Sequence, residues 1–196
     1  KMLFLGVLFG LYTAAVVYAL GSFLEERFPH EETPFYTAFF SSAGVEEAVK
    51  FLFLFFLIWG NHNFNEPLDG IVYGVFVSLG FAWAENVIYV THPILGGYET
   101  AFARALLSVP GHGLFGVRMG YYFALGKYRS RKRYLPLAFF SPYLAHALYN
   151  YFLLKREPVF WLFFSVLEAR LWVFGLKRIK ELQNCSPFRE KVSKES

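Results

Sequence analysis

The chain has 196 residues, of which 56% are hydrophobic, 21% aromatic and 17% charged, with a formal net charge of +4. A soluble domain is about 45–50% apolar and about 25% charged, so the composition excludes an ordinary soluble domain. It also excludes a disordered chain, which needs low hydrophobicity and high net charge, and the single cysteine excludes a disulfide framework or a cysteine-based zinc site.

Six apolar segments are long enough to cross a bilayer as helices. Runs of about 18 or more apolar residues with few charges are typical of transmembrane helices. The segments are Met2–Leu24, Phe35–Trp59, Asp69–Thr91, Ala101–Gly126, Tyr134–Leu154 and Pro158–Leu176. The sequence therefore predicts an all-α, polytopic transmembrane helix bundle, with one transmembrane domain over residues 1–182 and a polar cytoplasmic tail over residues 183–196.

The charges of the short loops predict the orientation. The loop around residues 25–32 is acidic, the segment 127–133 reads KYRSRKR, and the tail from Lys177 onward is basic. By the positive-inside rule both termini are cytoplasmic, which places 12 Lys and Arg residues inside and three outside. We therefore expect a multi-pass protein of a prokaryotic-type cell membrane. Its basic residues would contact anionic lipid headgroups rather than nucleic acid.

The second apolar segment carries Glu46, Glu47 and Lys50 in the sequence GVEEAVKF. Charged groups at bilayer depth are costly, so each is a candidate for function. Lys50 lies four residues after Glu46 and three after Glu47, so it can reach both carboxylates on a helix. One glutamate would suffice to pair with Lys50 for packing, and the second indicates a functional site.

The third segment carries Phe81, Glu85 and Asn86 in the sequence FAWAEN. Glu85 has no basic neighbour within one turn of its own helix. It must therefore find a partner on another helix, hold a proton or bind a metal. Small residues at four-residue spacing beside it predict close packing against a neighbouring helix, and they are Gly70, Gly74, Ser78, Ala82 and Asn86.

The fourth segment places Arg104, Ser108 and His112 on one helix face, each four residues apart. Pro110 removes a backbone hydrogen bond and lies next to Gly111, which predicts a break in the helix at His112. Irregular backbone inside a membrane is tolerated where it lines a watery cavity. We therefore expect water near His112.

The fifth segment carries His146 and Asn150, again four residues apart on one face. At a rise of about 1.5 Å per residue, the glutamates and histidines of four segments reach a common level in the middle or outer half of the membrane. The sequence therefore predicts a water-filled pocket that opens outward.

These side chains are suited to hydrolysis of a peptide bond. A carboxylate in a dry pocket becomes a usable general base, so Glu46 or Glu47 together with Glu85 would activate water. His146 and Asn150 would stabilise the oxyanion.

The same residue types also suit zinc, which prefers histidine nitrogen and carboxylate oxygen. The candidate ligands are Glu47, Glu85, His112 and His146. Spacing does not separate the two mechanisms, so the cofactor is either none or a divalent zinc ion.

Four motifs in this order resemble one known family. VEEAVKF, FAWAEN preceded by DGIVYG, SVPGHGLFG and HALYN each lie on a different segment, within residues 35–152. Together they resemble the PrsW family of intramembrane proteases, which is related to the CAAX prenyl endopeptidases. The resemblance implies cleavage of a membrane-anchored protein, as in site-1 cleavage of anti-sigma factors.

The resemblance also implies roles for individual residues. Glu46 and Glu47 match the paired glutamates, Glu85 matches the acid of the second motif, and His112, His146 and Asn150 match the remaining catalytic positions. Lys50, Phe81, Asn86 and Arg104 are the expected supporting residues. Related CAAX enzymes have histidine at the position of Glu85, which leaves the choice between glutamate and metal chemistry open.

Two other functions compete with proteolysis. A proton-coupled transporter would use the same Glu and His residues as a relay, although the chain has no inverted repeat. A scaffold would bind other membrane helices through the small residues of the third segment.

Overall fold

The computed structural model describes residues 2–27, 33–92, 96–129 and 133–188, which form helices and short connections without a strand. All six predicted apolar segments are helical. The helices are α1 (Met2–Arg27), α2 (Pro34–Tyr36), η1 (Thr37–Gly44), α3 (Val45–Ile58), α4 (Pro67–Thr91), α5 (Tyr98–Leu106), α6 (Ser108–Tyr128), α7 (Tyr134–Lys155) and α8 (Pro158–Asn184). The fold class is thus all-α, as predicted.

Three of these helices, α1, α4 and α8, are long and apolar enough to cross a membrane by length and composition. At about 1.5 Å per residue, the 25 residues of α4 exceed the roughly 30 Å hydrocarbon core of a bilayer. The outer surface carries many large apolar side chains, for example Phe56, Tyr12 and Leu162, which are 76%, 70% and 62% exposed. Such a surface is suited to lipid rather than water.

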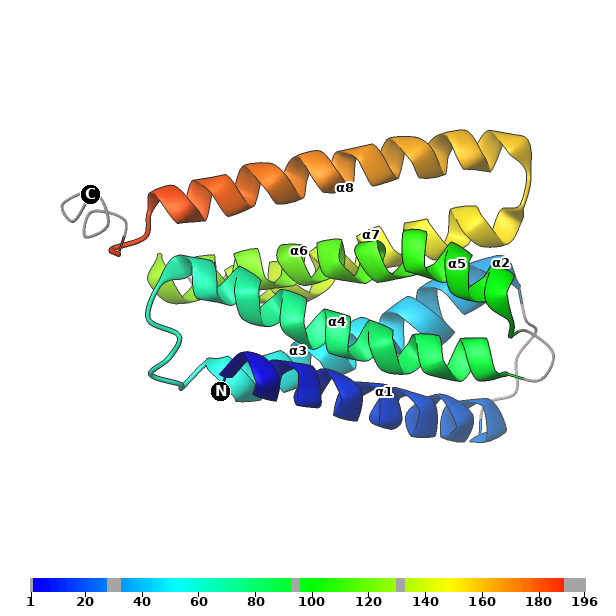
Figure 1. Cartoon of the computed structure of the whole chain (residues 1–196), viewed down its shortest axis with the longest axis horizontal. Coiled ribbons are helices and arrows are strands. Elements are labelled where there is room, and N and C mark those ends of the chain that lie inside the picture. Colours follow the sequence, from blue (N-terminus) through cyan, green and yellow to red (C-terminus); the bar gives the residue numbers. More distant parts are fainter. Residues whose placement is uncertain (1, 28–32, 93–95, 130–132, 189–196) are drawn as a thin grey trace.

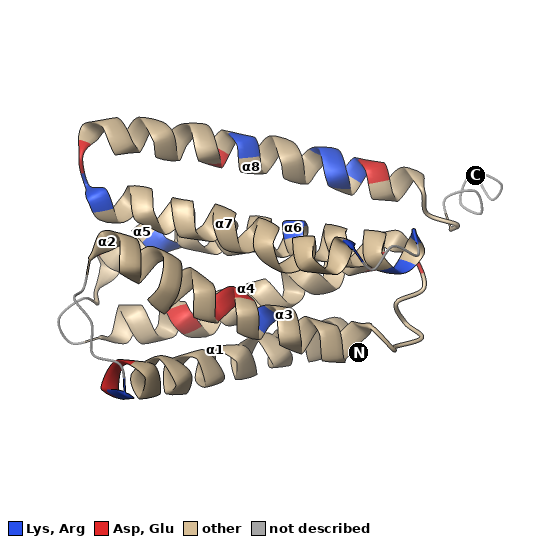
Figure 2. Ribbon diagram, turned by 180° about the vertical axis from the view of Figure 1, so that it is seen from behind, with Lys and Arg blue, Asp and Glu red and all other residues tan. Residues whose placement is uncertain are grey.

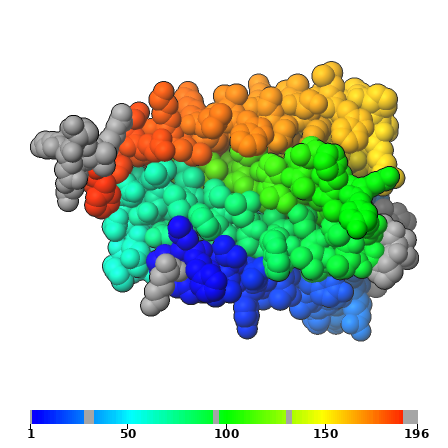
Figure 3. All heavy atoms as spheres, in the orientation of Figure 1, coloured from blue at the N-terminus to red at the C-terminus, as the bar shows by residue number. Residues whose placement is uncertain are grey.

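The long helices run side by side and alternate in direction, so the start of α1 and the end of α8 lie at the same end of the bundle (Figure 1). Charged residues concentrate toward the ends, with a few halfway along (Figure 2). In the space-filling view α1 and α8 cover opposite long sides of the molecule (Figure 3). The inner helices, which carry the predicted motifs, lie between them.

Helices α4 and α6 pack with their backbones in direct contact. A Cβ atom added to Gly74 would lie 2.5 Å from the carbonyl oxygen of Gly116, and one added to Gly116 would lie 2.6 Å from that of Gly74. Only glycine permits this approach of two backbones. The small residues of α4 therefore pack against a neighbouring helix, as predicted, and fix Glu85 beside α6.

The predicted break at His112 is wrong in its position. The helix is interrupted at Leu107, between α5 and α6, and His112 lies in regular helix. Pro110 has no N–H to bond the carbonyl of Leu106, so the ladder stops there, and it resumes with the bond from Gly111 N to Leu107 O at 3.0 Å. Proline is tolerated in the first turn of α6, where an N–H would have no helical partner.

A π-helical turn, η1, precedes the paired glutamates. Its wider winding brings the carbonyl of Phe39 to within 2.8 Å of the place where a Cβ of Gly44 would be. Glycine is therefore required where η1 meets α3. π-Helical turns are rare and are found frequently at functional sites.

Several charged residues used to predict the orientation lie outside the described residues, namely those in 28–32, 130–132 and 189–196, together with Lys1. Helix α8 continues to Asn184, past the predicted end of the sixth segment at Leu176. The division at residue 182 stays a prediction.

Candidate active site

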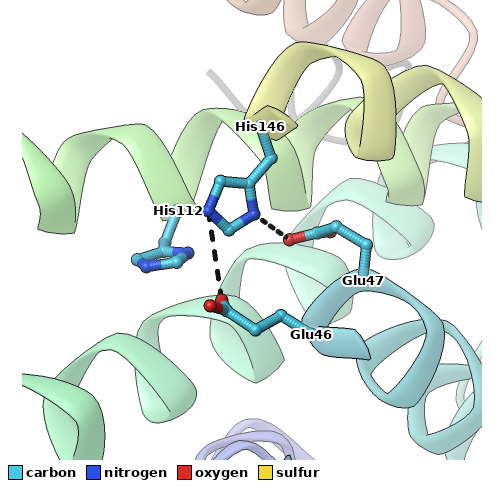
Figure 4. A group of neighbouring side chains, drawn as sticks. All are labelled: Glu46, Glu47, His112 and His146. Atoms are coloured by element: carbon cyan, nitrogen blue, oxygen red, sulfur yellow. Dashed lines mark hydrogen bonds and ion pairs between the residues drawn. The ribbon is translucent and has the colours of Figure 1, made fainter. Parts of the chain in front are cut away.

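The predicted site residues meet between α3, α4, α5, α6 and α7, halfway along the bundle. Figure 4 shows Glu46 and Glu47 of α3 beside His112 of α6 and His146 of α7. All four are buried. Residues up to 100 positions apart in the sequence therefore share one polar centre.

Lys50 contacts three other polar residues of this centre. Its Nζ donates to Glu47 Oε1 at 2.9 Å and to Glu46 Oε2 at 3.3 Å, as the helical spacing predicted. Nζ also lies 3.1 Å from Nδ1 of His112. A lysine ammonium has three donors and no acceptor, so all three N–H groups are used and Nδ1 of His112 is an acceptor.

A first chain of polar contacts connects His112 with residues of α4 and α5. Because Nδ1 of His112 accepts from Lys50, its Nε2 carries the proton and donates to Glu85 Oε2 at 2.9 Å. Arg104 contacts the same oxygen at 2.8 Å, and its Nε donates to Asn86 at 2.6 Å. Glu85 thus has partners on other helices, which is one of the three alternatives that the sequence left open for it.

A second chain of polar contacts connects Glu47 with residues of α7. Oε1 of Glu47 lies 2.9 Å from Nδ1 of His146, which donates to it. Asn150 Nδ2 donates to Nε2 of His146 at 3.1 Å and to Ser42 Oγ at 2.9 Å. Ser42 in turn donates to Glu46 at 2.8 Å, which closes the ring of contacts.

Two phenylalanines hold the polar groups in place. Phe81 is buried, with its ring 4.0 Å below Nζ of Lys50 and 5.3 Å from the ring of His112. Phe115 stacks on His146 with ring centroids 4.6 Å apart. A cation above an aromatic face is stabilised by the ring quadrupole. The supporting role predicted for Phe81 is thus a direct contact with Lys50.

Sequence reasoning missed Ser42 and Phe115. Ser42 lies one turn before Glu46, so its spacing was a usable signal, whereas nothing in the sequence distinguishes Phe115 from the other phenylalanines.

A cavity of about 300 Å³ borders this centre. Its walls include Glu85, His112, His146 and Asn150, together with Ser42 and apolar side chains of α5 and α7. Water and an extended peptide segment could enter such a space. Four of the six predicted catalytic residues therefore line this cavity, whereas Glu46 and Glu47 are not among the residues that line it.

The two adjacent glutamates differ in their surroundings. Glu47 is completely buried, whereas Glu46 is 6% exposed and its Oε2 lies 4.0 Å from Nε2 of His146. Glu46 thus approaches His146 on the side of Nε2, whereas Glu47 accepts from Nδ1 and orients the ring of His146.

One group of side chains in the described structure has metal-ligand chemistry. Glu46, Glu47, His112 and His146 offer ligand atoms within 4.8 Å of one another. Three of the four predicted candidates belong to this group, with Glu46 in the place of Glu85. Zinc would need these atoms at about 2.0–2.2 Å, but Lys50 Nζ already contacts three of the four residues. As arranged, the group does not fit a divalent ion.

Comparisons with known proteins agree with the motifs. The family described as "PrsW family intramembrane metalloprotease" matches residues 1–174. The chain is 41% identical to Protease PrsW of Geobacillus kaustophilus over 152 residues, which cover 76% of this chain and 65% of that protein. The match thus spans slightly less than two thirds of that relative's length.

Two further relatives carry the same name. The chain is 38% identical to Protease PrsW of Oceanobacillus iheyensis over 182 residues, covering 92% of this chain and 80% of that protein. It is 37% identical to Protease PrsW of Bacillus subtilis over 154 residues, covering 76% and 68%. No solved structure matches the chain.

Proposed function

The chain belongs to the PrsW family of intramembrane proteases, and we propose that it hydrolyses a peptide bond of a membrane-anchored protein. The observation that carries this proposal is the cavity of about 300 Å³ walled by Glu85, His112, His146 and Asn150. A base, a hydrogen-bonded histidine and an oxyanion donor are the parts that hydrolysis of an amide requires.

Glu85 is the general base of the proposed mechanism. Both of its contacts among the described residues, to Arg104 and His112, use Oε2. Oε1 is therefore left to accept a proton from a water in the cavity. Three carboxylates (Glu46, Glu47, Glu85) and two cations (Lys50, Arg104) give the centre a net negative charge when its histidines are neutral. It can therefore take up one proton.

The reaction then proceeds in two steps. Water gives a proton to Glu85 and its oxygen adds to the peptide carbonyl carbon, which forms a tetrahedral oxyanion. Asn150 Nδ2 donates to this oxyanion, with the substrate oxygen replacing Ser42 or His146 as acceptor. Collapse breaks the C–N bond and Glu85 returns the proton to the leaving nitrogen, so that the carboxylate is regenerated.

We also propose that the chain crosses the membrane six times with both ends in the cytoplasm. Supporting this, the start of α1, the end of α6 and the end of α8 lie at one end of the bundle. Cys185, the single cysteine, is exposed at this end.

A membrane-impermeant thiol reagent should label Tyr98→Cys in a Cys185→Ser background from outside intact cells. Labelling of native Cys185 from outside would contradict the orientation.

The substrate is a membrane protein, and by family analogy an anti-sigma factor is the first candidate. The chain should be reconstituted in liposomes with single-span candidate substrates and the products mapped by mass spectrometry. Replacing Glu85 with Gln removes the base and should lower cleavage by at least about 10³-fold while helicity is kept, since both base catalysis and positioning of the water are lost. Cleavage by Glu85→Gln at the wild-type rate would exclude this mechanism.

A further inference from the structure

Lys50 lies where a metal ion would be expected. Its Nζ makes contacts of 2.9, 3.3 and 3.1 Å with Glu47, Glu46 and His112, which are three of the four residues with ligand chemistry. The fourth, His146, contacts the same oxygen of Glu47 that Lys50 does. The acceptors that would bind a cation are thus already directed at an ammonium.

We infer that the Lys50 ammonium is the resident cation of this centre and excludes a divalent metal from it. The inference rests on the proposed function, because it states how that site is charged and positioned. It departs from the family description, which includes the word metalloprotease. The reason for this difference is the position of Lys50 Nζ, which contacts Glu46, Glu47 and His112.

The side chain of Lys50 is enclosed by its neighbours. Its side chain is completely buried, and Nζ lies over the ring of Phe81 at 4.0 Å. A divalent ion bound to the same oxygens would place two like charges side by side in a dry interior, where their repulsion is weakly screened. Binding of a metal would therefore require the buried ammonium to lose its acceptors and either move into an apolar environment or give up its proton.

The ammonium also determines the tautomer of His112. By donating to Nδ1 of His112, Lys50 leaves the proton on Nε2, which donates to Glu85. Lys50 is therefore a positioning residue that holds the paired glutamates and His112 in one arrangement.

The test is zinc binding by the purified full chain, measured by equilibrium dialysis and elemental analysis without substrate. Lys50→Met keeps the length of the side chain, removes the charge and leaves Glu46 and Glu47 without a counter-ion. Zinc affinity should rise about 100-fold or more, toward one ion per chain, because buried unpaired carboxylates are costly. Bound Co²⁺ should then give visible absorption bands that the wild-type chain lacks.

Two variants serve as controls. Lys50→Arg keeps the positive charge and should not gain zinc, and Lys180→Met removes an exposed lysine of α8 and should behave like the wild type. Equal zinc affinity of Lys50→Met and the wild type would overturn the inference.

The wild-type chain provides a second measurement that does not depend on the folding of a variant. One tightly bound zinc per wild-type chain, removed by a chelator together with activity, would also overturn the inference. An inactive wild-type chain that binds no zinc would contradict the proposed protease function and leave the resident cation standing. The two failures are thus distinguishable.

Discussion

Two networks of ion pairs in this molecule have the same chemistry but different surroundings. In the central network, Lys50 contacts Glu46 and Glu47 with side chains that are 0%, 7% and 0% exposed. In the terminal network, Glu181 of α8 contacts Arg129 just after α6 and Arg178 on its own helix. Arg129 is 53% exposed and Glu181 26%.

The difference shows what burial does to a charge. Exposed ion pairs contribute only about 0–1 kcal/mol, because water solvates each partner nearly as well as the other partner does. A buried pair is weak evidence of stability, yet removing one partner costs about 3–5 kcal/mol since the other charge stays behind without compensation. The central network is therefore the one whose members depend on each other.

Glu47→Gln tests this dependence with the largest expected effect. Gln keeps the size of the side chain but removes the negative charge between Lys50 and His146, and its amide would replace Oε2, which is buried without a partner in the described structure. Unfolding in mixed micelles with SDS, followed by circular dichroism, should show a loss of about 3 kcal/mol.

The double variant Glu47→Gln/Lys50→Met is the matched control for Glu47→Gln. It also removes the cation beside Glu46, which then stays buried without a counter-ion, so the double variant should lose more stability than Glu47→Gln alone. A loss of less than about 1 kcal/mol for Glu47→Gln would mean that the central pair behaves like an exposed one.

The contacts within one helix were predictable from the sequence. The spacing of Glu46, Glu47 and Lys50 fixes their distances once the segment is helical, and the small residues of α4 predicted its close packing. A partner for Glu85 on another helix was one of three predicted alternatives, beside a held proton and a bound metal, because a buried carboxylate without a partner is costly. That Arg104 and His112 both fill this role depends on how α5 and α6 are placed.

The features that could not be predicted depend on the rotation and winding of whole helices. Spacing does not tell which of Glu46 and Glu47 is nearer the cavity, because they are adjacent and the rotation of α3 decides. Ser42 lies in the π-helical segment η1 and contacts Asn150. No residue pattern in the sequence predicts this π-helical winding. The helix was expected to break at His112, but the interruption is at Leu107. The reason is that the N–H missing at Pro110 would have bonded a carbonyl one turn nearer the N-terminus.

Glu181→Gln tests the terminal network and has the smallest expected effect. The variant weakens the contacts with Arg129 and Arg178 and the hydrogen bond that Glu181 accepts from Tyr121 at 3.2 Å. All of these lie at the end of the bundle, away from the cavity. The free energy of unfolding should therefore fall by less than about 1 kcal/mol, and substrate cleavage should not change. Because exposed pairs are screened by salt, the difference from the wild type should shrink further as the salt concentration rises to about 1 M, where the Debye length is only about 3 Å. If Glu181→Gln instead cost as much as Glu47→Gln and its cost did not respond to salt, burial would not be what separates the two networks.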